Sequence, residues 1–189
     1  MWPWGHLALA YLVYSLYSRV RRGHRPTPAT ALVVAIASQA PDLVDKPLAW
    51  TLSLLPSGRS LGHSLLTVLP VVALAYTVAV ARSNDEEPLV VALGVGALVH
   101  LFGDALYPLF DLEFRHAGFL LWPAVPSLEH EIEQSFIAHF ALLDLSPEFY
   151  FELLLVAMAL VVWRADGYPG LATLRSWPAR AWRGVVGAD

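Results

Sequence analysis

Six residues of this chain carry side chains that divalent metal ions bind, namely three imidazoles and three carboxylates. Neutral imidazole nitrogen and carboxylate oxygen are ordinary ligands of zinc, manganese and iron. All six lie at or near the end of an apolar stretch, where an ionisable group is costly in lipid and therefore indicates function. The six candidates are His6, Asp42, Asp45, His63, His100 and Asp104.

The spacing of these residues favours convergence. Asp42 and Asp45 are three residues apart, and His100 and Asp104 are four apart, so each pair shares one helical face. Helix bundles build metal sites from inward-facing groups at such spacings. Six ligands are more than one tetrahedral site needs. We therefore expect a divalent metal, with zinc as the first candidate, and enough ligands for two ions. A bound water would then act as a nucleophile with its pKa lowered toward about 7.

Composition indicates how these residues are positioned. The chain has 189 residues, 57% hydrophobic and 15% charged, whereas soluble domains average about 25% charged. This predicts an all-α, polytopic membrane helix bundle. The net charge of −4 and the lack of a basic patch indicate no nucleic-acid partner. Without cysteine, disulfides and thiolate sites are excluded. Composition does not indicate the oligomeric state.

We predict about five transmembrane helices from apolar stretches, against the length of about 20 residues that a bilayer requires; the first stretch is short. An amphipathic helix on the outer surface is expected over 128–143, after Ser127 as its cap. Residues 1–166 form the membrane domain, and 167–189 a cytoplasmic tail. The expected spans are Leu7 to Val20, Pro28 to Leu48, Leu61 to Ala81, Pro88 to Phe110 and Phe149 to Trp163.

Basic residues set the expected orientation. Nine of the twelve Lys and Arg residues fall in the segments that follow the first, third and fifth spans. The positive-inside rule then puts the N-terminus outside and the C-terminus in the cytoplasm of an inner membrane protein. All six candidate ligands fall at the outer face. On the outer face, the expected Lys and Arg residues are only Lys46, Arg59 and Arg115.

Each candidate has an ordinary alternative role. Asp42 can simply pair with Lys46, and Asp104 can orient His100 without touching a metal. Asp45 is either a ligand or a general base. Arg59 can bind a substrate phosphate or carboxylate through two parallel hydrogen bonds. The histidines with weaker claims are His24, on the cytoplasmic side, and His116, His130 and His139, in the outer loop with the Glu129, Glu131 and Glu133 cluster.

The order of these residues resembles the membrane-bound metal-dependent hydrolases, also called LexA-binding inner-membrane-associated hydrolases. The similarity covers about residues 5 to 125, ending in Leu121-Trp122-Pro123. It implies hydrolysis, and by analogy with zinc-dependent phospholipases C it suggests a phosphoester substrate. The motifs are an early His, Pro-Asp with a second Asp, Arg followed by His-Ser, and His with Asp four residues later; here they are His6, Pro41-Asp42 with Asp45, Arg59 to His63-Ser64, and His100 with Asp104.

The chain departs from this pattern at two glycines. Gly58 stands where the family often has His, and Gly62 where it often has Thr. We expect a membrane-embedded hydrolase acting on a phosphoester of a lipid or lipid-linked substrate at the outer face, with Asp45 and Arg59 as catalytic residues. The first alternative is a non-catalytic protein with a structural metal or ion site. The second is an ion or proton transporter, which requires polar groups across the whole bilayer.

Overall fold

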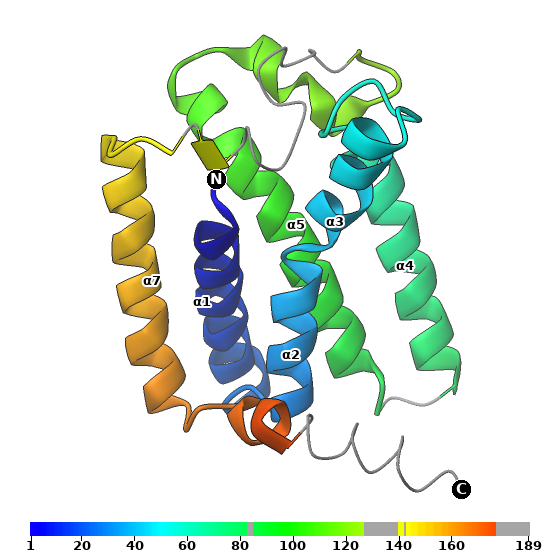
Figure 1. Cartoon of the computed structure of the whole chain (residues 1–189). Helices are drawn as coiled ribbons and strands as arrows, with labels where there is room; N and C mark the ends of the chain where they lie inside the picture. The colour runs from blue at the N-terminus through cyan, green and yellow to red at the C-terminus, as the bar shows by residue number, and fades with distance from the viewer. Residues whose placement is uncertain (83–84, 127–139, 142, 177–189) are drawn as a thin grey trace, which may run out of the picture.

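A computed structural model describes residues 1–82, 85–126, 140–141 and 143–176, and in these ranges all regular structure is helical. The all-α prediction is therefore confirmed. The two ends of the described chain lie at opposite ends of the bundle (Figure 1). The elements are α1 (Pro3–Arg22), α2 (Pro28–Ala37), α3 (Ala40–Lys46), the π-helical turn η1 (Pro47–Thr51), α4 (Leu65–Arg82), α5 (Glu87–Phe110), the 3-10 helix η2 (Phe114–Leu121) and α7 (Pro147–Ala165).

Helix α5 contacts α1, α2 and α4, while α7 packs against α1 (Figure 1). Small residues allow the close approaches. A Cβ added at Gly96 would lie 2.6 Å from the Cβ of Ala37, so α2 and α5 touch almost backbone to backbone. A Cβ at Gly103 would lie 3.0 Å from Nδ1 of His6. The glycine therefore lets α1 bring this imidazole against the C-terminal half of α5.

Two described helices, α4 and α5, are long and apolar enough to cross a membrane. The prediction of five such spans is wrong in this respect. Residues predicted as one second span, Pro28 to Leu48, instead form α2, α3 and the start of η1. Pro41 has no N–H to continue the helix, and the chain turns at Ser38 and Gln39. Helices α1 and α7 have 20 and 19 residues, but each carries three Asp, Glu, Lys or Arg side chains, against one in α4 and two in α5.

At the end of the bundle where α7 finishes, Asp166 ties α7 to α1. Its carboxylate accepts hydrogen bonds from Tyr11 and Ser15 at 2.7 Å and from Arg19 at 2.5 Å. This cluster is saturated by its own partners. The predicted outer helix over 128–143 falls almost wholly outside the described residues, as do His130, His139 and their glutamates.

Candidate metal centre

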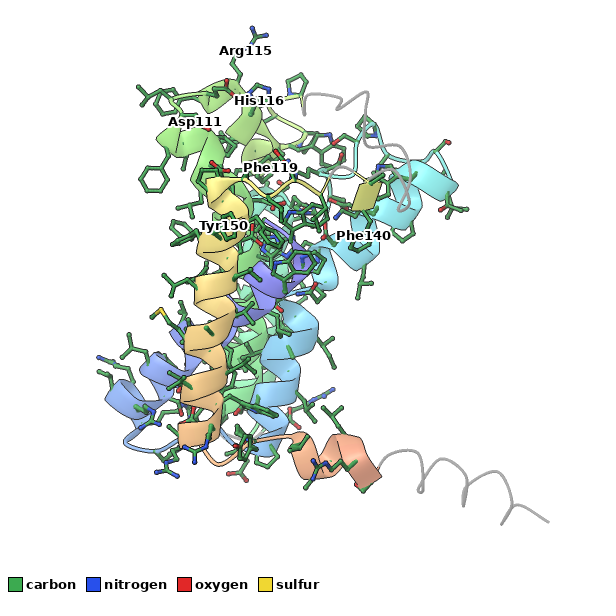
Figure 2. The ribbon with its side chains drawn as sticks, turned by 60° about the vertical axis from the view of Figure 1, so that its left-hand side comes forward. Asp111, Arg115, His116, Phe119, Phe140 and Tyr150 are labelled. Carbon is green, nitrogen blue, oxygen red and sulfur yellow. The ribbon has the colours of Figure 1, made fainter. Side chains whose placement is uncertain are left out.

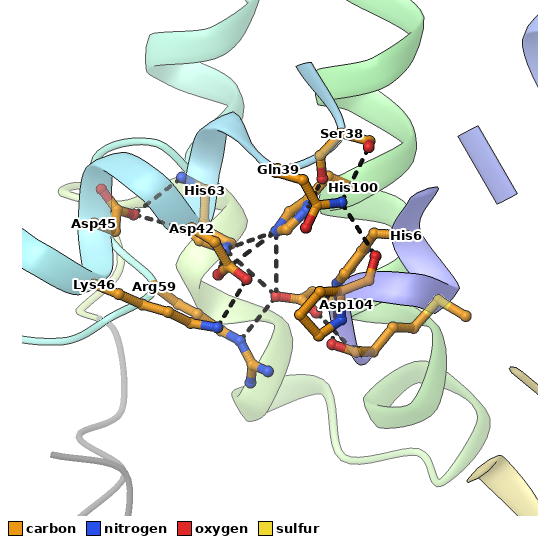
Figure 3. Close-up of polar contacts among 12 residues, drawn as sticks. His6, Ser38, Gln39, Asp42, Asp45, Lys46, Arg59, His63, His100 and Asp104 are labelled. Carbon is orange, nitrogen blue, oxygen red and sulfur yellow. Dashed lines mark hydrogen bonds and ion pairs between the residues drawn. The ribbon is translucent and has the colours of Figure 1, made fainter. Parts of the chain in front are cut away.

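Five of the six candidate ligands meet in one cluster (Figure 3), toward the end of the bundle opposite the one where α7 finishes (Figure 1). They form two triads, within each of which one ligand atom per residue lies within 4.8 Å of the others. The three imidazoles are fully buried and Asp104 nearly so. Helices α1, α3 and α5 and the loop before α4 supply them. The triads are His6, His100 and Asp104, and Asp42, His63 and His100.

The orientation of His100 is set by the break between α2 and α3. Its Nδ1 lies 2.6 Å from the carbonyl oxygen of Ser38, the residue that ends α2. A carbonyl oxygen only accepts, so Nδ1 must donate. In the neutral ring the lone pair is therefore on Nε2. The Nε2 atom points to the centre, where it lies 3.1 Å from Nε2 of His63.

The orientation of His63 is set by Asp45, which is fully buried. One carboxylate oxygen lies 2.8 Å from Nδ1 of His63, and the carboxylate also accepts from the backbone N–H groups of Ser60, Gly62 and His63 at 2.7 to 3.2 Å. Asp45 is in neither triad. Its oxygens face the loop over 60–63, so it is positioned to orient His63 and to keep the lone pair of the neutral ring on Nε2.

The two Nε2 atoms therefore face each other as acceptors across 3.1 Å, which repels unless a positive charge lies between them or on one ring. The surrounding carboxylates favour a positive charge on the ring of His63. Burial disfavours the imidazolium, but hydrogen bonds to the three surrounding carboxylates raise the pKa of His63 to about 10. The arrangement therefore demands a cation, either a proton or a metal ion.

The spacing of the Asp42 triad fits a metal ion. Its three edges are 3.1 Å between the two Nε2 atoms, 3.4 Å from Asp42 Oδ1 to His63, and 3.8 Å from Asp42 Oδ1 to His100. Zinc–nitrogen bonds of about 2.0–2.1 Å in a tetrahedron require ligand atoms about 3.4 Å apart. These ligands are thus close to tetrahedral spacing before any ion is added.

Asp104 connects the two triads. Its Oδ1 lies 3.1 Å from Nε2 of His6, and its Oδ2 lies 3.4 Å from Nε2 of His63. The amino group of Met1 donates to Oδ1 at 2.8 Å, and Nε of Arg59 donates to Oδ2 at 2.9 Å. Nδ1 of His6 is buried and has no hydrogen-bond partner among the described residues. A carboxylate between two histidine groups in this way can bridge two ions.

Asp42 has its own cation, Lys46. The Nζ of Lys46 lies 2.7 Å from Oδ2 of Asp42, and Oδ1 is left facing the histidines. Burial opposes ionisation of Asp42, but the hydrogen bond to His63 and the charge of Lys46 lower its pKa below the ordinary value. The spacing of four residues predicted this ion pair. The spacing did not predict that the ammonium group of Lys46 would lie beside the candidate metal ligands.

The two glycine departures have packing explanations. A Cβ at Gly58 would lie 3.2 Å from the ring of Trp50, so this indole occupies the room that a side chain would need. A Cβ at Gly62 would lie 3.0 Å from the backbone of Pro41 and 3.3 Å from Oδ1 of Asp45. Gly62 therefore allows the loop over 60–63 to close onto α3.

Two further histidines of the described chain lie outside both triads. His24 follows α1 at the opposite end of the bundle, where its Nδ1 lies 2.8 Å from the carbonyl of Arg25. His116 is on η2 and pairs with Glu113. Together with Arg115 it lies at the tip of the molecule, at the top of the view (Figure 2). Sequence reasoning missed the carbonyl of Ser38, because a backbone acceptor leaves no signal in residue type.

Comparison with known proteins gives one match. The family model described as YdjM inner membrane protein matches residues 1–172. No curated protein and no solved structure matches the chain. The match confirms the expected inner membrane protein, and it extends well beyond the residues that carried the sequence resemblance. The description names no reaction, so metal dependence and hydrolysis stay predictions.

Proposed function

The chain belongs to the YdjM inner membrane protein family, and on that premise we propose that it is a membrane-embedded, metal-dependent hydrolase. The substrate class is a phosphoester of a lipid or lipid-linked molecule. The observation that carries the proposal is the 3.1 Å approach of two imidazole nitrogens, both acceptors in the neutral rings and each fixed by a buried partner. Such a pair repels without a cation, and two carboxylates beside it complete the ligands for one.

The residues have distinct proposed roles. Asp42, His63 and His100 hold the first ion, with Asp104 beside them. His6 and the other oxygen of Asp104 are available to a second ion. Bound metal supplies a water whose pKa is lowered toward about 7 and which serves as the nucleophile.

Asp45 is proposed as the residue that orients His63, in place of a ligand or general base. The carboxylate oxygens of Asp45 already accept hydrogen bonds from three backbone N–H groups of the loop and from the ring of His63. Arg59 is proposed to bind the substrate anion and to stabilise the charge that develops on it. Its guanidinium is partly exposed while its Nε contacts Asp104.

The lipid substrate is supported by the position of the ligands along α5. His100 and Asp104 lie in the second half of this membrane-crossing helix, toward the end of the bundle that also holds α3 and η2 (Figure 1). A head group at the bilayer surface reaches this depth without leaving the membrane. We propose that this face is the outer one, with the N-terminus outside and the C-terminus in the cytoplasm.

Metal analysis and turnover test the proposal together. Purified protein loaded with zinc or manganese is expected to hydrolyse at least one member of a panel of lipid phosphoesters, and to lose turnover with a chelator. His63→Ala is expected to lose both metal and turnover, whereas His116→Ala keeps both. Unchanged metal content in His63→Ala would remove the proposed site.

The second candidate is a structural metal site without catalysis. Its support is the burial of the three imidazoles, because structural sites are closed and catalytic sites keep a coordination position open. Stoichiometric metal with no turnover of any phosphoester in the panel would favour this function.

A further inference from the structure

Two basic side chains contact the carboxylates of the metal centre, at its boundary with solvent. Lys46 contacts Asp42 and Arg59 contacts Asp104, at 2.7 and 2.9 Å. The side chains of Lys46 and Arg59 are 11% and 25% exposed, whereas those of His63 and His100 are fully enclosed. The side chain of Asp42 is 13% exposed, so a molecule that approaches from solvent meets Lys46, Arg59 and this carboxylate before it meets an imidazole.

Each cation is also held by an aromatic ring. Nζ of Lys46 lies 5.4 Å from the ring centroid of Trp50, and Cζ of Arg59 lies 5.9 Å from that of Phe119. Cations within about 6 Å of an aromatic centroid are attracted to its face. Trp50 in turn packs on Gly58, next to Arg59 in the chain. These contacts add to the ion pairs in holding both cations beside the centre.

Each carboxylate faces both cations and histidines. Asp42 gives Oδ2 to Lys46 and turns Oδ1 to His63, at 3.4 Å. Oδ2 of Asp104 contacts Arg59 and lies 3.4 Å from His63, while Oδ1 contacts His6 and the amino group of Met1. The formal charges of these two acids and two bases cancel. A divalent ion bound by the acids leaves this group of four with an excess of two positive charges before any anion binds, and a single dianion matches that excess.

We propose that Lys46 and Arg59 form a two-cation clamp that selects a dianionic phosphate group, as in a phosphomonoester or a terminal diphosphate, over a phosphodiester monoanion. This inference rests on the proposed function and narrows its substrate class. Lys46 acts on the substrate and not on the metal. Arg59 supplies a planar donor set that suits two phosphate oxygens, and Lys46 a compact ammonium for a third.

Anion binding to the zinc-loaded protein tests the clamp without any turnover. Calorimetry with inorganic phosphate and with dimethyl phosphate is expected to give tighter binding of phosphate. Lys46→Gln is expected to weaken phosphate binding by about tenfold or more, because a charge-assisted hydrogen bond is lost. Lys46→Arg restores most of it. Arg115→Gln removes a cation at the tip of the molecule (Figure 2) and is expected to change nothing.

Zinc content is measured on the same samples. The clamp is overturned if Lys46→Gln binds phosphate as tightly as the parent chain at equal zinc content, or if this variant loses zinc. Equal affinity for phosphate and dimethyl phosphate also overturns it. A parent chain that binds no zinc removes the metal site and the clamp together. A chain that binds zinc and hydrolyses nothing removes only the catalytic proposal, and the phosphate affinities still decide the clamp.

Discussion

Nδ1 of His63 donates to the carboxylate of Asp45 across 2.8 Å, and this contact decides which nitrogen of the ring faces the centre. Asp45→Asn keeps the shape of the side chain but adds an amide donor opposite the backbone N–H groups of the loop. We expect zinc affinity to fall about 10- to 100-fold, as for other residues that orient a ligand. Titration of the apoprotein with zinc measures this.

Ser60→Ala is the matched control in the same loop, because the Ser60 hydroxyl bonds to the carbonyl of Ser57 and only its backbone contacts Asp45. Zinc affinity is expected to stay near the parent value in this variant. Equal losses in both variants would mean that the loop, and not the carboxylate, controls the site.

His100 belongs to both triads, whereas His6 belongs to one. We therefore expect His100→Ala to lose all bound zinc and His6→Ala to keep the ion held by Asp42 and His63. Elemental analysis after dialysis gives the stoichiometry. His116→Ala, at the tip of the molecule, serves as the control and should match the parent chain. Retention of zinc by His100→Ala would contradict the assignment of that ring.

Zinc binding should release a proton from His63. Its pKa is raised from 6.5 to about 10 without metal, so the ring is protonated at neutral pH and must become neutral to bind an ion. Zinc affinity is then expected to rise about tenfold per pH unit below pH 10. Calorimetry in buffers of different ionisation enthalpy counts the protons.

The same shift has the opposite effect on the apoprotein. A raised pKa in the folded state contributes stability that is fully present below pH 6.5 and is lost as the pH rises through about 10. Thermal unfolding of zinc-free protein should therefore occur at lower temperature at pH 10 than at pH 6.5. No release of protons on zinc binding would contradict the assigned ionisation of His63.

Gly62→Ala is expected to destabilise the loop over 60–63 and to reduce zinc content. The new Cβ would lie 3.0 Å from backbone atoms of Pro41, which are fixed in α3. Overpacking of this kind costs about 1–3 kcal/mol of unfolding free energy. Gly118→Ala is the control, since its nearest neighbour is a side-chain carbon of Val125 at 3.1 Å that can shift. Denaturant unfolding compares the two.

Cysteine labelling tests the orientation, because the chain has no native cysteine. His24→Cys and Arg115→Cys lie at opposite ends of the bundle, and both positions are exposed. An impermeant reagent added to intact cells should label position 115 and leave position 24 unmodified until the membrane is opened. The reverse pattern would invert the proposed topology.

The fold class and the grouping of most candidate residues were predictable from sequence. The four-residue spacing of His100 and Asp104 lies within α5, which matches the predicted stretch almost end to end. The role of Asp45 was not predictable, because it depends on a loop that returns to α3 from fifteen residues later. The break in the second span was missed because the span was judged from its mostly apolar residues, and hydropathy does not register a missing N–H at Pro41.

The turn at Ser38 has a consequence for anyone who transplants this centre. The carbonyl that accepts from His100 is available because the chain leaves the helical path there. Grafting the same imidazoles and carboxylates onto ideal, unbroken helices would reproduce their spacing. The ring of His100 would still be free to rotate. A faithful copy must include the irregular backbone as one of its functional parts.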